Sequence, residues 1–453
     1  MGLSREIARF AVGTPAAGIP ASARDVMALS MLDWLAVAMA GQEEPVSRIV
    51  RNRIRSEGGT PESSVLGETE HYPARAAALA NGVASHALDY DDTHFDYIGH
   101  PSTVIVSAAL AVAERIDSPG RDFLDAALIG AECACRIGAW LGRNHYQQGF
   151  HQTATSGCFG AALACARLLG LRSEQAEQAI GIASTRSAGL KSQFGTMGKP
   201  YNAGVAASSG VECALLAADG FTSARNALEC DQGFAASHAG EFRDTRTVLG
   251  GLGKIYRFES VQHKFHACCH GIHASLEALS ELLTRNDLSP GQIEAVSVAV
   301  NPRWLKVCDL KAPGTGLEAK FSYRLAVAIA VLGRDTAAPG SFSDEACRSP
   351  ELIEMRDRVR VFPDEALADT AAEVEIRTRA GNVHGWHHDL ARLPGLPVRT
   401  ERVRAKAASL VGDGAARRLW DLVRSLPETR IREFVQHAGV ADRPAAVLPA
   451  AAR

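Results

Sequence analysis

The chain has 453 residues, of which 46% are hydrophobic and 22% are charged, and its formal net charge is −3. This composition is typical of a globular protein with a substantial core, and it excludes binding to nucleic acid or to an acidic membrane surface through overall charge. An anionic ligand would have to be held by a local cluster of Lys, Arg or His. The length predicts two or three domains.

The first half of the chain predicts one helix after another. Residues 23–40 place apolar side chains at helical spacing, and Gly41 suits the end of that helix. The same pattern covers residues 74–86, 103–115, 123–141, 157–169 and 173–184. We therefore predict a large all-helical domain over residues 1–255, completed by residues 395–453, where residues 400–435 return to a helical pattern.

The pattern changes after residue 253. Residues 293–300 and 374–378 alternate apolar with polar side chains, which is typical of strands, and residues 274–285 and 321–332 predict helices between them. We predict a smaller α+β domain over residues 256–394, so the fold class is mostly α with a second, α+β domain.

Cysteine usage and the N-terminal residues bear on the compartment. Ten cysteines occur without any CxxC pair, which fits small buried thiols in a reducing cytosol. The N-terminus lacks the features of a signal peptide, and no apolar run is long enough to span a bilayer. We therefore expect a cytoplasmic protein that does not associate with membranes.

The first segment that could carry chemistry is residues 81–94, NGVASHALDYDDTH. Three carboxylates and two histidines lie within nine residues. Because close carboxylates repel, at least one should have a raised pKa or a cationic partner. A solvated acidic turn is equally compatible with the pattern, and a metal site would need several converging oxygen ligands. His100, followed by Pro101 and Ser102, comes six residues later.

Two further segments each contain one notable basic residue. His151, within residues 146–154, lies at a predicted junction of loop and helix and suits acid–base chemistry or simple helix capping. Lys199 lies between Gly198 and Pro200 on a predicted constrained loop, where it could neutralise a carboxylate, act as a base, or be an ordinary surface lysine. The glycine spacing around it is not that of a phosphate-binding P-loop.

Residues 264–273, KFHACCHGIH, contain three histidines and two cysteines within eight residues. Such a cluster could bind zinc, but no second pair of ligand residues at structural-site spacing occurs elsewhere. We therefore predict no metal site. Residues 315–322, TGLEAKFS, predict a loop that leads into a helix.

Taken together, these segments resemble the MmgE/PrpD family, whose members include 2-methylcitrate dehydratase, cis-aconitate decarboxylase and iminodisuccinate epimerase. Six segments occur in family order: NGVASHALDYDDTH, HPS, GFHQTA, GTMGKPYNAG, KFHACCHGIHA and TGLEAKFS. The resemblance implies a large helical domain and a smaller α+β lid domain in a homodimer, with the site between the domains. It also implies that no metal and no organic cofactor is used.

The resemblance also assigns residues. The decarboxylase pattern places five of them at active-site positions: Asp89, Thr93, His100, His151 and Lys199. Lys264 matches a pocket position, and Tyr146 matches a tyrosine of the epimerase branch.

The chain also departs from the decarboxylase pattern. Cys269 and Asn202 stand where that enzyme has histidine, Ala267 replaces a family proline, and the spacing from Thr93 to His100 is one residue longer. These departures argue against decarboxylation of cis-aconitate.

From this resemblance we expect a cofactor-independent lyase or isomerase that removes a proton next to a carboxylate of a small polycarboxylic acid. His151 is the candidate base or acid, and Lys199, helped by His100, would bind a carboxylate. Asp89 would orient His100. The remaining candidates are Thr93, Thr196 and Lys264 for substrate binding, and Tyr146, Cys269, His270 and His273 for catalysis.

The fate of the carbanion stays open between dehydration, as in 2-methylcitrate dehydratase, and epimerisation, as in iminodisuccinate epimerase. Two other classes also stay open: a metal-dependent hydrolase and a non-catalytic polycarboxylate-binding protein.

Overall fold

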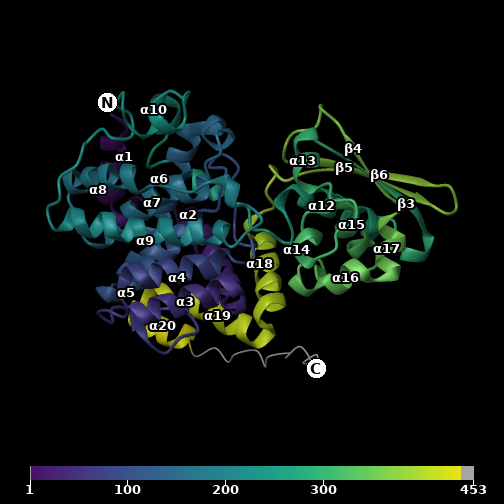
Figure 1. Ribbon diagram of the computed structural model, residues 1–453, viewed down its shortest axis with the longest axis horizontal. Coiled ribbons are helices and arrows are strands. Elements are labelled where there is room, and N and C mark those ends of the chain that lie inside the picture. The colour runs from purple at the N-terminus through teal and green to yellow at the C-terminus, as the bar shows by residue number, and fades with distance from the viewer. Residues whose placement is uncertain (1, 440–453) are drawn as a thin grey trace. The chain divides into compact units, whose positions relative to one another are not determined.

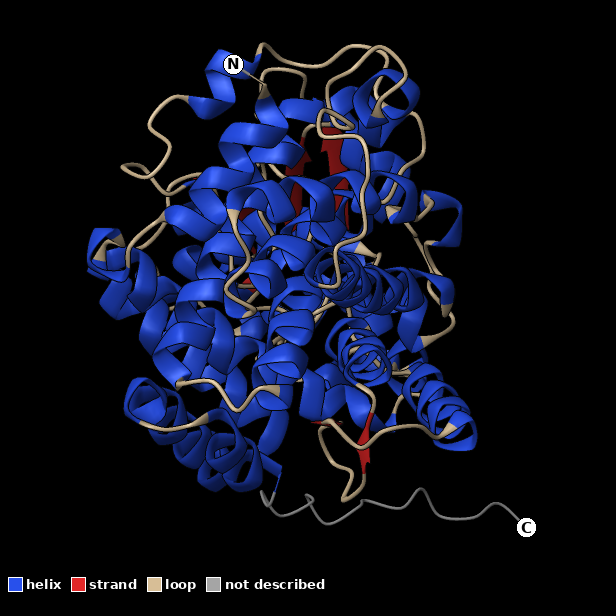
Figure 2. Cartoon of the chain, turned by 90° about the vertical axis from the view of Figure 1, so that its left-hand side faces the viewer, coloured by secondary structure: helices blue, strands red, loops and turns tan. Residues whose placement is uncertain are grey.

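The computed structural model describes residues 2–439, and the chain divides into two compact units. Unit 1 runs up to His263 and resumes at Val403, and unit 2 is Lys264–Arg402. The predicted domain boundaries, after residues 255 and 394, lie a few residues earlier along the chain. Helices dominate the described chain, and the strands are few (Figure 2). The predicted fold class, mostly α with a smaller α+β domain, is confirmed.

Unit 1 consists of helices and one very short two-stranded ribbon, and most of its helices are labelled in Figure 1. Its elements are α1 (Leu3–Gly13), α2 (Ala21–Ala40), α3 (Pro45–Glu57), β1 (Ser63–Ser64), β2 (His71–Tyr72), α4 (Ala74–His86), α5 (Pro101–Arg115), α6 (Gly120–Gln147), α7 (Gln152–Leu168), α8 (Ser173–Arg186), α9 (Gly198–Ala218), α10 (Phe234–His238), α11 (Thr245–Leu249), α19 (Asp413–Ser425) and α20 (Ile431–Gly439). Helix α18 (Leu396–Val411) begins in unit 2 and ends in unit 1.

The core of unit 1 lies around helices that are buried on most faces. Every residue of α5 except Arg115 is buried, and Trp34 of α2 donates a hydrogen bond to Ser107 of α5 at 3.1 Å. Such helices need apolar residues all round rather than a single stripe, as their sequences have. No helix among the described residues is long and apolar enough to cross a membrane.

Glycines let the helices that carry the site approach closely. A Cβ on Gly82 of α4 would lie 2.9 Å from Cα of Gly204 of α9, and a Cβ on Gly204 would lie 2.5 Å from the carbonyl oxygen of Leu79. The backbones of α4 and α9 are therefore in direct contact, because neither glycine has a side chain to separate them.

Helix α7 begins at Gln152, five residues before its predicted start, and α9 and α6 also differ from the sequence prediction. No helix was predicted over α9. The segment around Lys199, predicted as a loop, forms the first turn of α9, because Pro200 is compatible with an early helical position. Helix α6 continues past the predicted residue 141, with a break at Gly142, whose φ of 69° suits glycine.

Unit 2 is an α+β structure built on a four-stranded sheet. Its elements are α12 (His270–Arg285), β3 (Ile293–Val300), α13 (Pro302–Cys308), α14 (Gly316–Ala319), α15 (Tyr323–Val331), α16 (Asp344–Arg348), α17 (Pro350–Arg356), β4 (Val359–Pro363), β5 (Ala371–Thr378) and β6 (Val383–Asp389).

The strand order is β4-β3-β5-β6, with β3 and β4 parallel and the other neighbours antiparallel. Helices α12 and α15 pack against this sheet (Figure 1). Val296, Val298 and Val300 of β3 are buried on one face, as their alternation predicts.

Candidate active site

Asp89 lies in a turn that directly follows α4 and holds two basic side chains. Its backbone is left-handed, with φ of 52°, a conformation that Asp tolerates better than most residues. Lys199 Nζ lies 2.7 Å from Asp89 Oδ2, and His100 Nε2 lies 3.5 Å from Asp89 Oδ1. The strained turn therefore presents the carboxylate between a lysine from α9 and the histidine that caps α5.

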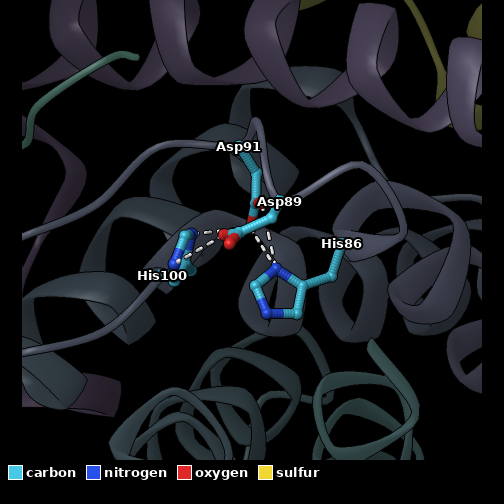
Figure 3. Close-up of side chains that lie close together, drawn as sticks. All are labelled: His86, Asp89, Asp91 and His100. Atoms are coloured by element: carbon cyan, nitrogen blue, oxygen red, sulfur yellow. Dashed lines mark hydrogen bonds and ion pairs between the residues drawn. The ribbon is translucent and has the colours of Figure 1, made fainter. Parts of the chain in front are cut away.

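Asp91, two residues later, bridges two imidazoles. Its carboxylate lies 2.9 Å from His86 Nδ1 and 3.1 Å from His100 Nδ1, and all three side chains are buried (Figure 3). Burial alone would raise the pKa of Asp91, but His100 and His86 outweigh it and hold that pKa well below its usual range. The ionised carboxylate of Asp91 favours a proton on the facing Nδ1 of His100, and the Nε2 of His100 then faces Asp89.

His151 is the N-terminal cap of α7 and is buried. Burial, followed by the charges of His86, Lys199 and His100, holds the pKa of His151 well below its usual value, so the ring is neutral at pH 7. The amide nitrogen of Asn202 donates to His151 Nδ1 at 3.3 Å. The proton of this neutral ring is therefore on Nε2, which makes His151 a hydrogen-bond donor at that atom.

Aromatic rings surround these groups. Phe194 packs edge-on against His151, with ring centroids 5.0 Å apart, and Lys199 Nζ lies 5.2 Å from the centroid of Phe194. The ring of His86 stacks on that of His151 with centroids 5.8 Å apart. Asp89, His100, His151 and Lys199, predicted from separate segments, are thus brought together in unit 1.

Three other sequence-predicted residues lie in unit 1: Thr93, Thr196 and Tyr146. Thr93 pairs through its backbone with Gln262. Thr196 is exposed, and its hydroxyl donates to the carbonyl of Gln193 and accepts from the N–H of Gly198, the first residue of α9. Lys191 Nζ lies 3.8 Å above the ring of Tyr146.

The predicted residues of unit 2 gather before and at the start of α12. Lys264 and His273 are buried, whereas Cys269 and His270 are half-buried. The rings of His270 and His273 lie with centroids 4.9 Å apart. Burial, followed by the charges of His270, His266 and Lys264, holds the pKa of His273 well below its usual value.

Four side chains of unit 1 could also hold a metal ion. One ligand atom each from His86, Asp89, Asp91 and His100 lies within 4.8 Å of the others. Lys199, at 2.7 Å from Asp89, already places a positive charge on one of these carboxylates. The arrangement therefore fits two kinds of chemistry, acid–base catalysis beside a bound anion and coordination of a divalent cation.

Sequence reasoning did not single out His86, Asp91 or Asn202 as site residues. Asp91 lay inside the predicted acidic segment, but the orienting role was predicted for Asp89. His86 is the last residue of α4, five positions before Asp91, and a buried histidine at a helix end followed by a carboxylate is the signal that could have indicated the pair.

The MmgE/PrpD N-terminal domain model matches residues 5–246, and the MmgE/PrpD C-terminal domain model matches residues 266–427. The chain belongs to the MmgE/PrpD family. The predicted resemblance is thereby confirmed over most of the sequence, and the matched regions contain the segments that carried it, apart from Lys264 and Phe265.

Curated relatives agree with the family. The chain is 27% identical to a cis-aconitate decarboxylase of Aspergillus terreus over 94% of this chain and 93% of the relative. It is 31% identical to the human cis-aconitate decarboxylase over 74% and 72% of the two chains, and 30% identical to a cis-aconitate decarboxylase-like protein of Aspergillus oryzae over 62% and 61%. The prediction that this MmgE/PrpD member is an enzyme is confirmed.

Proposed function

We propose that this chain is a lyase that removes a proton next to a carboxylate of a small polycarboxylate, without a metal or an organic cofactor. The observation that carries the proposal is the paired arrangement of Asp91 with His100 and of Asp89 with Lys199. The curated relatives, which are named cis-aconitate decarboxylases, support a polycarboxylate as the substrate class.

His100 is the base in this proposal. Its Nδ1–H donates to Asp91, so its Nε2 can accept the proton from carbon, and Asp91 then stabilises the imidazolium that forms. Lys199 binds a substrate carboxylate and offsets its charge. Asp89 holds the ammonium of Lys199 in place at 2.7 Å.

His151 acts as the donor to the developing charge. A neutral imidazole whose Nε2 carries the proton can stabilise an enolate-like oxygen by donating a hydrogen bond to it. Loss of one such donor typically costs about 3–4 kcal/mol of transition-state stabilisation. This proposal gives His151 the role of hydrogen-bond donor, whereas the sequence suggested a base or an acid.

Two lyase outcomes use the same groups. In dehydration, His100 removes the proton and the electron pair left on carbon expels hydroxide from the neighbouring carbon. In decarboxylation, departure of CO₂ leaves the electron pair on carbon, and a protonated His100 delivers a proton to the resulting carbanion. The names of the curated relatives favour decarboxylation. Cys269 and Asn202, which replace histidines of the decarboxylase pattern, favour dehydration or epimerisation. We also propose that some residues of unit 2 bind the substrate or return the proton, and the same assay tests them by substitution. These residues are Lys264, Cys269, His270 and His273.

The experiment is a substrate screen in D₂O followed by NMR. The wild-type enzyme is incubated with cis-aconitate, with 2-methylcitrate and with related di- and tricarboxylates. Turnover with solvent deuterium at the carbon next to a carboxylate supports the proposal, and the product separates dehydration from decarboxylation. His100→Ala and Lys199→Ala should suppress both turnover and labelling, whereas His387→Ala and Lys254→Ala, at exposed positions, serve as matched controls.

A metal-dependent hydrolase is the second candidate, favoured by the convergence of His86, Asp89, Asp91 and His100. Metal analysis of the purified protein and assay after EDTA treatment discriminate the two. A stoichiometric metal, with activity lost on chelation and restored by that metal, would replace the lyase proposal; unchanged activity in EDTA would support it.

The family resemblance is the basis for our proposals on the oligomeric state and the cellular location of the protein. We expect a homodimer in the cytoplasm, acting on a small molecule and not on nucleic acid or membranes. Light scattering on the purified chain tests the dimer, and cell fractionation tests the location.

A further inference from the structure

Two cysteines of unit 2, Cys269 and Cys308, flank the same short segment of chain. Cys269 is the N-terminal cap of α12, and its N–H donates to the carbonyl of Lys320 at 2.9 Å. Cys308 is the last residue of α13, and the next residue, Asp309, forms a bridge with Ser322. Each cysteine is therefore fixed beside residues 320–322 by its backbone.

The helix that follows Cys269 also packs closely on the helix that ends at Cys308. A Cβ on Gly271 would lie 2.4 Å from the ring of Trp304 in α13, so α12 begins in direct contact with that helix. The Tyr323 hydroxyl donates to the carbonyl of Gly271 at 2.7 Å and holds this turn in place. The thiol of Cys308 hydrogen-bonds to Cys269, so the two sulfurs are neighbours.

The two thiols differ in their surroundings. Cys269 is half-buried at the N-terminus of a 16-residue helix, where the partial positive charge of the helix end favours a thiolate. Cys308 is fully buried; the hydrogen bond to Cys269, and then burial, raise the pKa of Cys308 well above its usual value. Cys269 is thus the half-buried residue whose thiolate is suited to attack, and Cys308 is the buried residue whose thiol stays protonated.

A second pair shows that proximity alone is not sufficient. Cys213 of α9 hydrogen-bonds to Cys158 of α7, but both residues are fully buried among helices of unit 1. A soluble oxidant has no access to that pair. The pair in unit 2 differs from this pair because one of its members, Cys269, is half-buried.

We propose that Cys269 and Cys308 form a reversible disulfide in response to hydrogen peroxide. The Cys269 thiolate attacks one peroxide oxygen, the O–O bond breaks, and hydroxide leaves as Cys269 becomes a sulfenic acid. The Cys308 sulfur then attacks the Cys269 sulfur as its proton and the sulfenic hydroxide leave together as water. Two thiols are oxidised, and one peroxide is reduced to two waters.

The disulfide would withdraw Cys269 from any role in the reaction, since that residue is among the candidate catalytic groups. The test of the disulfide does not depend on the proposed lyase activity, because mass spectrometry detects the oxidation state of the cysteines directly. Thiol reductants would restore the pair by exchange.

The test uses the full chain and peptide mass spectrometry. The wild-type protein is treated with a few equivalents of hydrogen peroxide, remaining thiols are alkylated, and fragment spectra locate the cross-link. We expect a peptide that links Cys269 to Cys308, lighter than the two free peptides by two hydrogens, and its loss after dithiothreitol. In Cys308→Ser, the sulfenic acid of Cys269 should persist and be trapped by dimedone at least several-fold more than in the wild type.

Two variants keep the test decisive. Cys230→Ser removes another half-buried thiol and should leave the cross-link unchanged. Cys269→Ser should abolish both the cross-link and the dimedone adduct, which covers the case in which Cys308→Ser does not fold. A cross-link from Cys269 to Cys268, equal dimedone trapping in the wild type and Cys308→Ser, or Cys269 left unmodified while Cys230 is oxidised would each overturn the proposal.

Discussion

At the scale of single residues, Asp91 changes the assignment of roles in the candidate site. The sequence predicted that Asp89 orients His100, but both carboxylates face this ring: Asp91 lies 3.1 Å from His100 Nδ1, and Asp89 lies 3.5 Å from Nε2. We assign the orienting role to Asp91, the nearer of the two. The other pairs with Lys199 and lies beside the atom that would take the proton.

We predict that Asp91→Asn lowers kcat strongly while the protein still folds. The amide is nearly isosteric, but it cannot stabilise an imidazolium at His100, and a dyad carboxylate of this kind typically contributes about 10²–10⁴-fold to the rate. Steady-state kinetics on the substrate found in the screen measure the effect. Asp96→Asn, at an exposed carboxylate beside Arg257, should change kcat by less than about twofold. Full activity in Asp91→Asn would remove His100 from the role of base.

Asp92 leads to a pH prediction. Burial, and then the charge of Asp33, raise the pKa of Asp92 to about 7, while Ser102 donates to both of its oxygens. A raised pKa in the folded state means that stability is greatest below the unfolded value, near 4, and is lost as the pH rises through 7.

We therefore predict that Asp92→Asn removes this loss. Relative to the variant, the wild type should lose on the order of 2 kcal/mol of unfolding free energy between pH 5 and pH 8. Urea denaturation at several pH values measures the difference. Parallel pH profiles for the two proteins would show that Asp92 is already ionised in the folded state at pH 5.

The sequence could indicate candidate site residues, but not which of them face one another. The family resemblance pointed to His100, His151 and Lys199, whereas the local pattern left helix capping or an ordinary surface lysine equally open. The pairing of Asp91 with two imidazoles depends on the left-handed turn at Asp89 and on the packing of α4 against α5, which no local pattern reports.

At the scale of elements, the crossing of α4 and α9 positions the site. His86 ends α4, and Lys199 lies in the first turn of α9, so a change in the distance between these helices would move both. The helices touch at Gly82 and Gly204, where a Cβ would meet backbone atoms that have no room to move.

We predict that Gly204→Ala destabilises the protein by about 1–3 kcal/mol and lowers activity, because the added methyl group overlaps the Leu79 carbonyl. Chemical denaturation and the kinetic assay measure the two effects. Gly13→Ala is the matched control: Gly13 is also helical, a Cβ there meets nothing within 4 Å, and its stability change should stay within about 0.5 kcal/mol. Equal stability of the two variants would mean that the helices can separate without cost.

The elements that were predicted well are those with a clear period. The predicted residues 74–86 and 293–300 coincide with α4 and β3, since apolar spacing decides both. Strand β6 was missed because its sequence, VHGWHHD, has little apolar alternation and pairs with β5 at the edge of the sheet. Helix α9 was not predicted, and its first turn was predicted as a loop because Gly198 and Pro200 are typical loop residues.

At the scale of the whole molecule, the C-terminal helices complete unit 1 through a buried charge. Lys406 of α18 lies 2.6 Å from Asp33 of α2 and donates to the carbonyl of Tyr90, which stands between Asp89 and Asp91. Residues far apart in the sequence therefore support the turn that carries the site. Sequence periodicity predicted that these helices exist, but it carries no information on this pairing.

We predict that Lys406→Met destabilises the protein by about 3 kcal/mol, because Asp33 loses its buried cationic partner. The double variant Lys406→Met with Asp33→Leu should recover part of that loss, since no unpaired charge then stays buried. Urea denaturation of the three proteins measures the coupling. Strict additivity of the two substitutions would contradict it.

The central claim is that this enzyme transfers a proton at a carbon next to a carboxylate through His100. The direct measurement is NMR of a polycarboxylate substrate turned over in D₂O by the wild type and by His100→Ala. The account predicts deuterium at that carbon with the wild type, in the product after decarboxylation or in recovered substrate where hydroxide departs, and at least a hundredfold less turnover and labelling with the variant at equal folded concentration. Equal turnover and equal labelling by the two proteins would contradict it.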